Sequence, residues 1–142
     1  MSDALAPFTQ LWADAFHAAI EGDADYRASA SGWKWPIALV MDPAPEHGYP
    51  RAVAVEVMLD RGHSYGATAI PAGEVSAPFV LQGTYATWKA VMREGLDPVL
   101  AVATGKLSLA KGALTTLMLH TGSARKLVGL ARRIPTRFPD DA

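Results

Sequence analysis

Residues 105–112 read GKLSLAKG, and the structure assigned to this stretch decides how the rest of the chain is interpreted. Polar and apolar side chains alternate through it, and a glycine stands at each end. Alternation at a period of two is typical of a strand with one buried face, and glycine permits a tight turn. We therefore expect the last strand of a sheet over 105–110, with Leu107 and Leu109 pointing inwards and Lys106 facing water.

Upstream of this strand the apolar period changes to that of helices. Gly83 ends a short apolar strand over 77–81, and Thr84 is a suitable N-cap for the helix that follows. The inner face of this helix is expected to carry Tyr85, Trp88, Val91 and Met92. Asp97 followed by Pro98 predicts the start of another short helix, because an acidic cap and a proline in the first turn both favour one.

Downstream of the strand two more helices are predicted. Leu114, Leu117 and Met118 share one face of the first. Ser123 is expected to cap the second, whose apolar positions run to Ile134 and which ends at Pro135.

The N-terminal half begins with a helix and continues with strands. A single helical stripe is formed by Phe8, Leu11, Trp12, Ala15, Phe16, Ala19 and Ile20, with Pro7 in the first turn. Asp23 is expected to cap a second, short helix. Alternation then predicts a strand over 33–40, placed at a sheet edge by Pro36, and two strands over 52–59 and 64–70 joined by a tight turn.

This order of elements predicts an α+β fold with a mostly antiparallel sheet covered by helices. A length of 142 residues fits one domain over 1–142, and we find no repeat or linker. Half of the residues are hydrophobic and the net charge is −1, which argues against nucleic acid as a partner. The basic residues at 125–137 are interpreted as a solvated helix face in preference to an anion or membrane-surface contact.

The cellular location is predicted from the absence of membrane-spanning and secretory patterns. No run of 18 apolar residues exists, so stable membrane insertion is not expected. The first ten residues lack the pattern of a secretory signal, and the chain has no cysteine. We expect a cytoplasmic protein.

Catalytic and cofactor motifs are missing from the sequence. There is no GxGxxG or Walker loop and no GxSxG elbow, and the four histidines lack metal-ligand spacing. Ser64 lies in a predicted hairpin, where solvent is the expected partner. Glu56 in the middle of a strand and His120 at a helix end are the two acid/base candidates, for which a solvent-facing and a capping role respectively are favoured. We therefore predict no enzyme activity, no cofactor and no metal.

Two tryptophans are the strongest pointer to a binding site. Trp33 and Trp35 would lie on the same face of one strand, where they either fill a very large core or border a hollow. Tyr85 and Trp88 could form the opposite wall. Such a wall would be apolar, with a few polar points at the indole N–H and phenol O–H groups. That is the composition of a pocket for a lipid.

The stretch over 77–136 resembles the sterol carrier protein 2-like family of lipid-binding domains. The similar features are the aromatic helix at Trp88, the segment from Gly95 to Ala101, the strand GKLSLAKG, and the apolar helix face from Leu114 to Leu119. The resemblance implies a five-stranded, largely antiparallel sheet and an apolar cavity that binds fatty acids, acyl-CoAs or sterol-like lipids. The chain ends in FPDDA, without the peroxisomal signal common in eukaryotic carriers. Its tail over 134–140 resembles more closely that of free-standing bacterial members of the family.

Together, the aromatic pattern and the resemblance predict which side chains contact an apolar ligand: Trp33, Trp35, Ile37, Val57, Leu59, Phe79, Leu81, Tyr85, Trp88, Met92, Leu107, Leu117, Met118 and His120. Three hypotheses remain at this stage. The chain binds and possibly transfers a lipid, or it is a ligand-free structural module that forms a homodimer, or it is a small enzyme that uses His120 or Glu56 in the same cavity.

Overall fold

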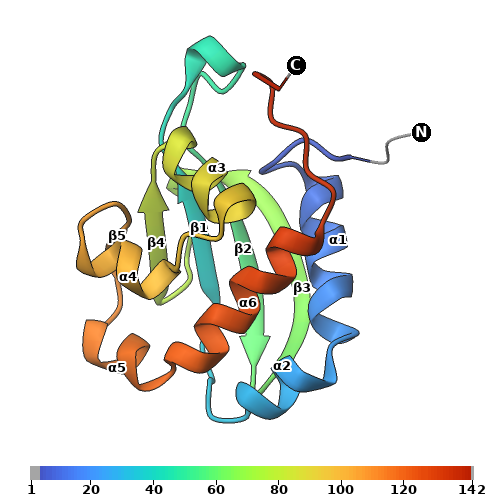
Figure 1. Cartoon of the computed structure of the whole chain (residues 1–142), viewed down its shortest axis with the longest axis vertical. Helices are drawn as coiled ribbons and strands as arrows, with labels where there is room; N and C mark the ends of the chain where they lie inside the picture. The colour runs from blue at the N-terminus through green and yellow to red at the C-terminus, as the bar shows by residue number, and fades with distance from the viewer. Residues whose placement is uncertain (1–3, 142) are drawn as a thin grey trace.

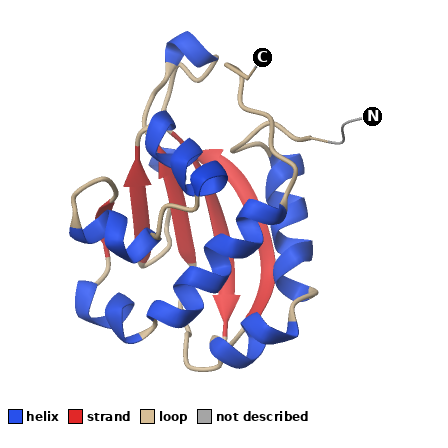
Figure 2. Cartoon of the chain, in the orientation of Figure 1, coloured by secondary structure: helices blue, strands red, loops and turns tan. Residues whose placement is uncertain are grey.

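Five strands form one sheet in a computed structural model that describes residues 4–141 (Figures 1 and 2). The strands are β1 (Ile37–Met41), β2 (Val53–Asp60), β3 (His63–Pro71), β4 (Phe79–Gly83) and β5 (Ser108–Lys111), arranged in the order β3-β2-β1-β4-β5. Of the four pairings between these strands only β1–β4 is parallel, so the predicted α+β fold with a mostly antiparallel sheet is confirmed. Residues 1–3 and 142 of the expected 1–142 domain lie outside the described residues.

The strand β1 corrects the prediction made for residues 33–40. It begins at Ile37, and it lies in the middle of the sheet between β2 and β4, not at an edge. All five of its residues are buried, because helices cover one face and a loop covers the other. Trp33 and Trp35 precede the strand, and Pro36 disrupts no ladder because pairing starts one residue later.

Six α-helices lie in residues 4–141: α1 (Gln10–Glu21), α2 (Ala24–Ser29), α3 (Tyr85–Glu94), α4 (Pro98–Ala103), α5 (Leu114–Leu119) and α6 (Thr121–Arg133). Two short 3-10 helices, η1 (Pro45–His47) and η2 (Ala72–Glu74), interrupt the loops. The predicted caps Asp23, Thr84 and Asp97 each accept hydrogen bonds from backbone N–H groups of the helix that follows. Side-chain capping satisfies donors that have no partner within the helix.

Several other helix and strand limits differ from the prediction; for example, β4 covers Phe79–Gly83 and not 77–81. Helix α1 starts at Gln10, capped by Thr9, because Phe8 has a positive φ of 58° that ends any helical run before it. The last strand starts at Ser108, and Leu107 lies buried just before it while Leu109 is only partly buried. Helix α6 starts at Thr121 directly after α5, and Ser123 is not its cap: the Ser123 hydroxyl donates to the carbonyl of His120.

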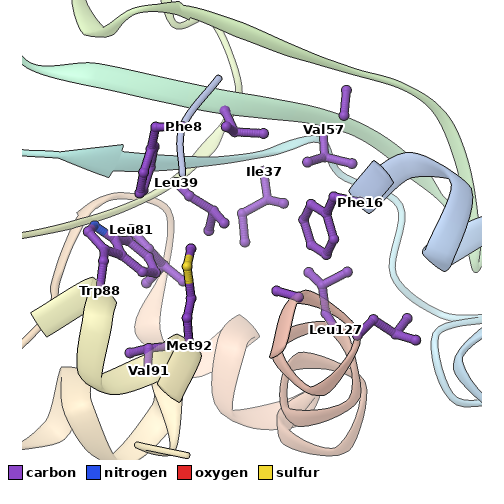
Figure 3. Packing of buried hydrophobic residues seen from close by; sticks show 14 of the residues in the cluster. Phe8, Phe16, Ile37, Leu39, Val57, Leu81, Trp88, Val91, Met92 and Leu127 are labelled. Atoms are coloured by element: carbon purple, nitrogen blue, oxygen red, sulfur yellow. The ribbon is translucent and has the colours of Figure 1, made fainter. Parts of the chain in front are cut away.

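The core lies between the inner face of the sheet and the helices. Figure 3 shows side chains from α1, α3 and α6 converging on those of the strands, for example Phe16 beside Ile37 and Val57. A smaller cluster on the outer face consists of Ala38, Val40, Ala54, Ala77 and Val80. The sheet therefore has one face covered by helices and one covered mainly by the loop between β3 and β4.

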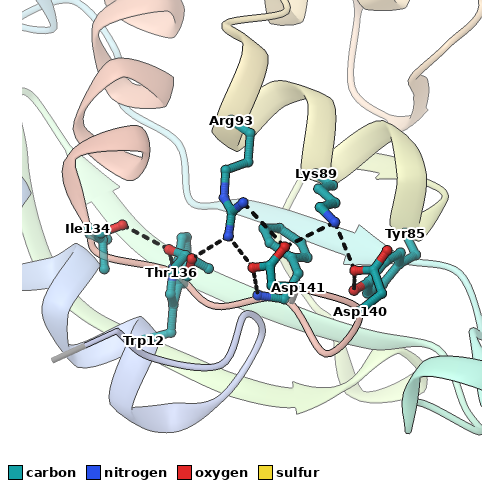
Figure 4. A network of polar contacts seen from close by, with 9 residues as sticks. Trp12, Tyr85, Lys89, Arg93, Ile134, Thr136, Asp140 and Asp141 are labelled. Atoms are coloured by element: carbon teal, nitrogen blue, oxygen red, sulfur yellow. Dashed lines mark hydrogen bonds and ion pairs between the residues drawn. The ribbon is translucent and has the colours of Figure 1, made fainter. Parts of the chain in front are cut away.

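The C-terminal segment after α6 is fastened to α3 by a polar network (Figure 4). Phe138 is fully buried, and the cationic groups of Lys89 and Arg93 lie 5.6 and 5.3 Å from its ring centre. Lys89 binds Asp140 and Asp141, and Arg93 also binds Asp141. The segment's partners Tyr85, Lys89 and Arg93 are spaced four residues apart, so the segment packs along one side of α3.

Candidate ligand-binding site

A narrow apolar seam lies between the inner face of the sheet and the helix layer. Its floor consists of Ile37 and Leu39 from β1, Leu59 from β2 and Leu81 from β4. Its roof consists of Trp88, Val91 and Met92 from α3, Pro98 and Val99 from α4, Leu117 from α5, and Ser123, Ala124, Leu127, Val128 and Ala131 from α6. Phe16, Tyr26 and Trp33 complete its walls. We call this set of residues the apolar seam.

The local periods of the chain explain why these side chains meet. In β1, Ile37 and Leu39 are two residues apart and point to the same side of the sheet. In α3, Trp88 and Met92 are four residues apart and lie on one face. Figure 3 shows Trp88, Val91 and Met92 directed towards Leu39 and Leu81. The seam is thus the contact zone of one sheet face with several helical stripes.

The free volume inside the seam is about 30 Å³. That is room for one or two water molecules, whereas pockets for drug-sized ligands measure about 300–1,000 Å³. The helices α3, α4, α5 and α6 must therefore move away from the sheet before a lipid can enter. The expected large cavity is not present in this structure.

The two indole N–H groups around the seam are paired with backbone carbonyls of the protein itself. The indole N–H of Trp88 donates to the carbonyl of Val40 at 2.8 Å. The indole N–H of Trp33 donates to the carbonyl of Trp35 at 2.7 Å. These two groups, which the sequence suggested as polar points for a ligand, are already used, so the tryptophans present carbon surface to the seam.

Half of the side chains predicted to contact a ligand line the seam. They are Trp33, Ile37, Leu59, Leu81, Trp88, Met92 and Leu117. Val57, Phe79 and Leu107 are buried in the same core but do not line the seam. Phe79 packs against Trp33, which lines the seam, with 4.8 Å between their ring centres.

The other four predicted side chains lie away from the seam. Met118 is 58% exposed on the outer side of α5. Tyr85 points to the C-terminal segment, where its hydroxyl donates to Asp140 at 2.6 Å and its ring stacks on that of His47. Burial, followed by this hydrogen bond, raises the pKa of Tyr85.

The remaining two, Trp35 and His120, form an aromatic cluster with Trp33. The ring of His120, at the junction of α5 and α6, lies edge-on 5.3 Å from that of Trp33 and 6.2 Å from that of Trp35. Only Trp33 of the three lines the seam. The structure therefore brings His120 next to the seam wall and not into the seam.

Sequence reasoning missed the parts of the seam that come from α1, α2 and α6. Phe16, Tyr26 and Leu127 are examples, and each is buried. The signal was present, since Phe16 and Leu127 belong to apolar helical stripes. What the sequence did not show is that both stripes pack on the same sheet face as α3.

Groups that could perform chemistry have structural partners. The carboxylate of Glu56 accepts hydrogen bonds from the backbone N–H groups of Ser76 and Ala77, so it holds the loop on the outer face and does not simply face solvent. Ser64 is buried, and its hydroxyl lies 2.7 Å from Nδ1 of His17, which corrects the expectation of a solvent partner. Neither Ser64 nor His17 lines the seam.

Glu21 of α1 lies beside Ser64 and His63 and forms a polar cluster with them and with His17. Its carboxylate accepts the backbone N–H of Ser64 and lies 3.4 Å from His63. Burial alone would raise the pKa of Glu21, but these partners hold that pKa below its usual value. The cluster ties α1 to the start of β3. Within residues 4–141, no three His, Asp or Glu side chains gather closely enough to hold a metal ion.

Comparison with solved structures places the fold among known proteins. The chain superposes on a crystal structure of sterol carrier protein 2 with a TM-score of 0.86 and 37% identity, over 90% of this chain and 98% of the other. It superposes on the solution structure of a conserved hypothetical protein from Thermus thermophilus, described as possibly a sterol carrier protein, with a TM-score of 0.86 and 34% identity, over 96% and 97% of the two chains.

A more distant structure shares the fold alone. Sterol carrier protein 2 from Yarrowia lipolytica, in its apo form, superposes with a TM-score of 0.56 at 11% identity, over 94% of this chain and 99% of that one. No protein-family sequence model and no curated protein sequence matches the chain. The two structures above 30% identity are covered almost completely, and the chain therefore belongs to the sterol carrier protein 2-like family.

Proposed function

We propose that the chain binds a hydrophobic ligand, such as a fatty acid, an acyl-CoA or a sterol-like lipid, in the apolar seam. The observation that carries the proposal is the lining itself. Floor, roof and walls are almost wholly aliphatic or aromatic, and the indole N–H groups of Trp33 and Trp88 are turned to backbone carbonyls. The names of the two similar structures, which mention a sterol carrier, support the same ligand class.

Binding energy in such a seam would come from buried area. Each buried methylene group is worth about 0.8 kcal/mol, so a tail of about twelve carbons would gain roughly 10 kcal/mol before costs. The cost is the separation of the sheet from the helix layer, because the free volume is only about 30 Å³. The short helices α4 and α5 have few turns to resist such a movement. We therefore propose that the helix layer moves away from the sheet when the ligand binds.

The proposal includes carriage of the ligand and no reaction on it. Because the seam lining is mainly carbon surface and contains no His, Asp, Glu, Lys or Arg, we assign the protein no catalytic step. We place it in the cytoplasm, in keeping with a sequence that has no cysteine. Among the described residues, no helix is long and apolar enough to cross a bilayer.

A ligand-free structural module is the second candidate, and the small free volume favours it. Native mass spectrometry of freshly purified protein separates the two, because it detects bound lipid and oligomers in one spectrum. The binding proposal predicts adducts in the mass range of lipids on the monomer, which excess palmitate displaces. A lipid-free spectrum that stays unchanged after incubation with palmitate, together with a dimer, would favour the structural module.

A further inference from the structure

Helix α5 has two unlike sides. Leu117 is buried and lines the apolar seam. Leu114, Met118 and Leu119 are instead 44%, 58% and 83% exposed. Leu114 and Met118 are four residues apart, so they lie one above the other on the same side of the helix. A helix of six residues thus exposes three large apolar side chains.

The apolar exposure is concentrated in this part of the chain. Seven large hydrophobic side chains are exposed in residues 4–141, and four of them fall between 100 and 119, where Leu100 of α4 adds to the three of α5. α4, β5 and α5 follow one another with short links, and Figure 1 shows them on the side of the molecule where β5 forms the edge of the sheet. Exposed apolar groups gathered in one region mark an interaction surface.

The charged residues within 98–139 are all basic, and two of them are paired with acidic residues outside that range: Arg125 with Asp97 and Arg133 with Asp23. Residues 98–139 contain no Asp or Glu, although the chain has 14 of them and a net charge of −1. The same residues hold seven of its 13 lysines and arginines. Lys106 and Lys111, between α4 and α5, are exposed, and neither forms an ion pair with any described residue. We call Leu114, Met118, Leu119, Lys106 and Lys111 the α5 face.

We propose that the α5 face docks on the surface of an anionic lipid bilayer. Apolar side chains that enter the boundary between headgroups and acyl chains, with lysines at the level of the phosphates, are how proteins lie on such a surface. Because residues 98–139 include no Asp or Glu, none of them adds repulsion from such a surface. Docking here is reversible and superficial, because only one short helix is involved.

Docking would also bring the seam to the membrane. Leu117 lies between the exposed residues of α5 in sequence and forms part of the seam roof. A lipid that leaves the bilayer beneath α5 would therefore meet the seam directly. This last step rests on the proposed function, whereas docking itself does not depend on it.

Flotation with lipid vesicles tests the proposal. We expect the protein to float with phosphatidylcholine vesicles that contain about a third phosphatidylglycerol, and to bind pure phosphatidylcholine far less. Leu119→Ser should lower the partition coefficient about ten-fold, the effect of one leucine side chain. Leu11→Ser is the matched control, since Leu11 is an exposed leucine (68%) on α1, and it should leave the partition unchanged.

A second pair of variants tests the charges. Lys106→Gln combined with Lys111→Gln should weaken binding to the anionic vesicles by ten-fold or more, whereas Arg51→Gln, a change at an exposed basic residue in the loop before β2, should not. Equal flotation of wild type and Leu119→Ser, or no flotation of the wild type, would overturn the proposal. So would a dimer in sedimentation velocity that Leu119→Ser disperses, because a second copy would then occupy the face. Vesicle binding without palmitate uptake would refute only the proposed function.

Discussion

The indole N–H of Trp88 in α3 donates to the backbone carbonyl of Val40 in β1 at 2.8 Å, across one side of the apolar seam. Both residues are buried. The bond fixes α3 to the central strand and directs the carbon surface of the indole to the seam. The helix that forms part of the roof is thus held by a polar contact at the edge of an otherwise apolar zone.

Trp88→Phe should therefore destabilise the protein without removing the aromatic wall. The buried carbonyl of Val40 loses its indole donor, which costs about 1–3 kcal/mol in the free energy of unfolding. Urea unfolding followed by circular dichroism measures the loss. Wild-type stability in Trp88→Phe would show that the bond does not hold α3 in place.

The C-terminal segment makes the free energy of unfolding depend on pH. The hydrogen bond from Arg93, above all, lowers the pKa of Asp141 to about 2, and the partners Lys89 and Tyr85 lower that of Asp140. A lowered pKa in the folded state means that the stabilisation is complete above the pKa of the unfolded chain, near 4, and is lost as the pH falls towards 2. Asp141→Asn should thus be less stable than wild type at pH 6.

The same variant provides the control for that prediction. As the pH falls from 5 to 2, the difference in urea midpoint between wild type and Asp141→Asn should shrink, because the wild-type carboxylate becomes protonated. A difference that stays constant over this range would mean that the ion pair of Asp141 with Arg93 does not stabilise the folded chain.

We predict that replacing Gly62 in the β2–β3 turn lowers the stability of the folded chain. Its φ is +90°, and a Cβ atom there would lie 2.5 Å from the backbone carbonyl oxygen of Arg27. Gly62→Ala should cost roughly 2–5 kcal/mol, from backbone strain plus displacement of α2. Gly48→Ala is the matched control, because Gly48 has φ +86° but open space around it, and it should cost only about 1–2 kcal/mol. Equal thermal midpoints for the two variants would contradict the close approach.

Local signals in the sequence predicted local structure well. Asp23, Thr84 and Asp97 cap helices as expected, because a cap depends only on a few neighbouring atoms. Alternation failed at Trp33 and Trp35: a loop can also alternate, and β1 is buried on both faces so it shows no alternation of its own.

The residues that line the apolar seam could be predicted only in part, because some of them meet only through tertiary packing. Trp88, Met92 and Leu117 could be assigned from the stripes of α3 and α5. Phe16 and Leu127 meet across the seam from opposite ends of the chain, and no period within a helix reveals its tertiary partner. Met118 and Leu119 follow Leu117 directly but face outwards, which depends on how α5 is set against α6.

Ligand uptake by a variant with a filled seam tests the central claim most directly. Ala124 lines the seam, and Ala124→Phe would occupy its free space; Ala86→Phe places the same ring on the exposed side of α3. Uptake of cis-parinaric acid is measured by energy transfer from the tryptophans, with thermal unfolding as the check on folding. We predict saturable uptake by wild type and Ala86→Phe, and uptake about ten-fold weaker by folded Ala124→Phe. Equal uptake by all three proteins, or none by the wild type, would contradict binding in the seam.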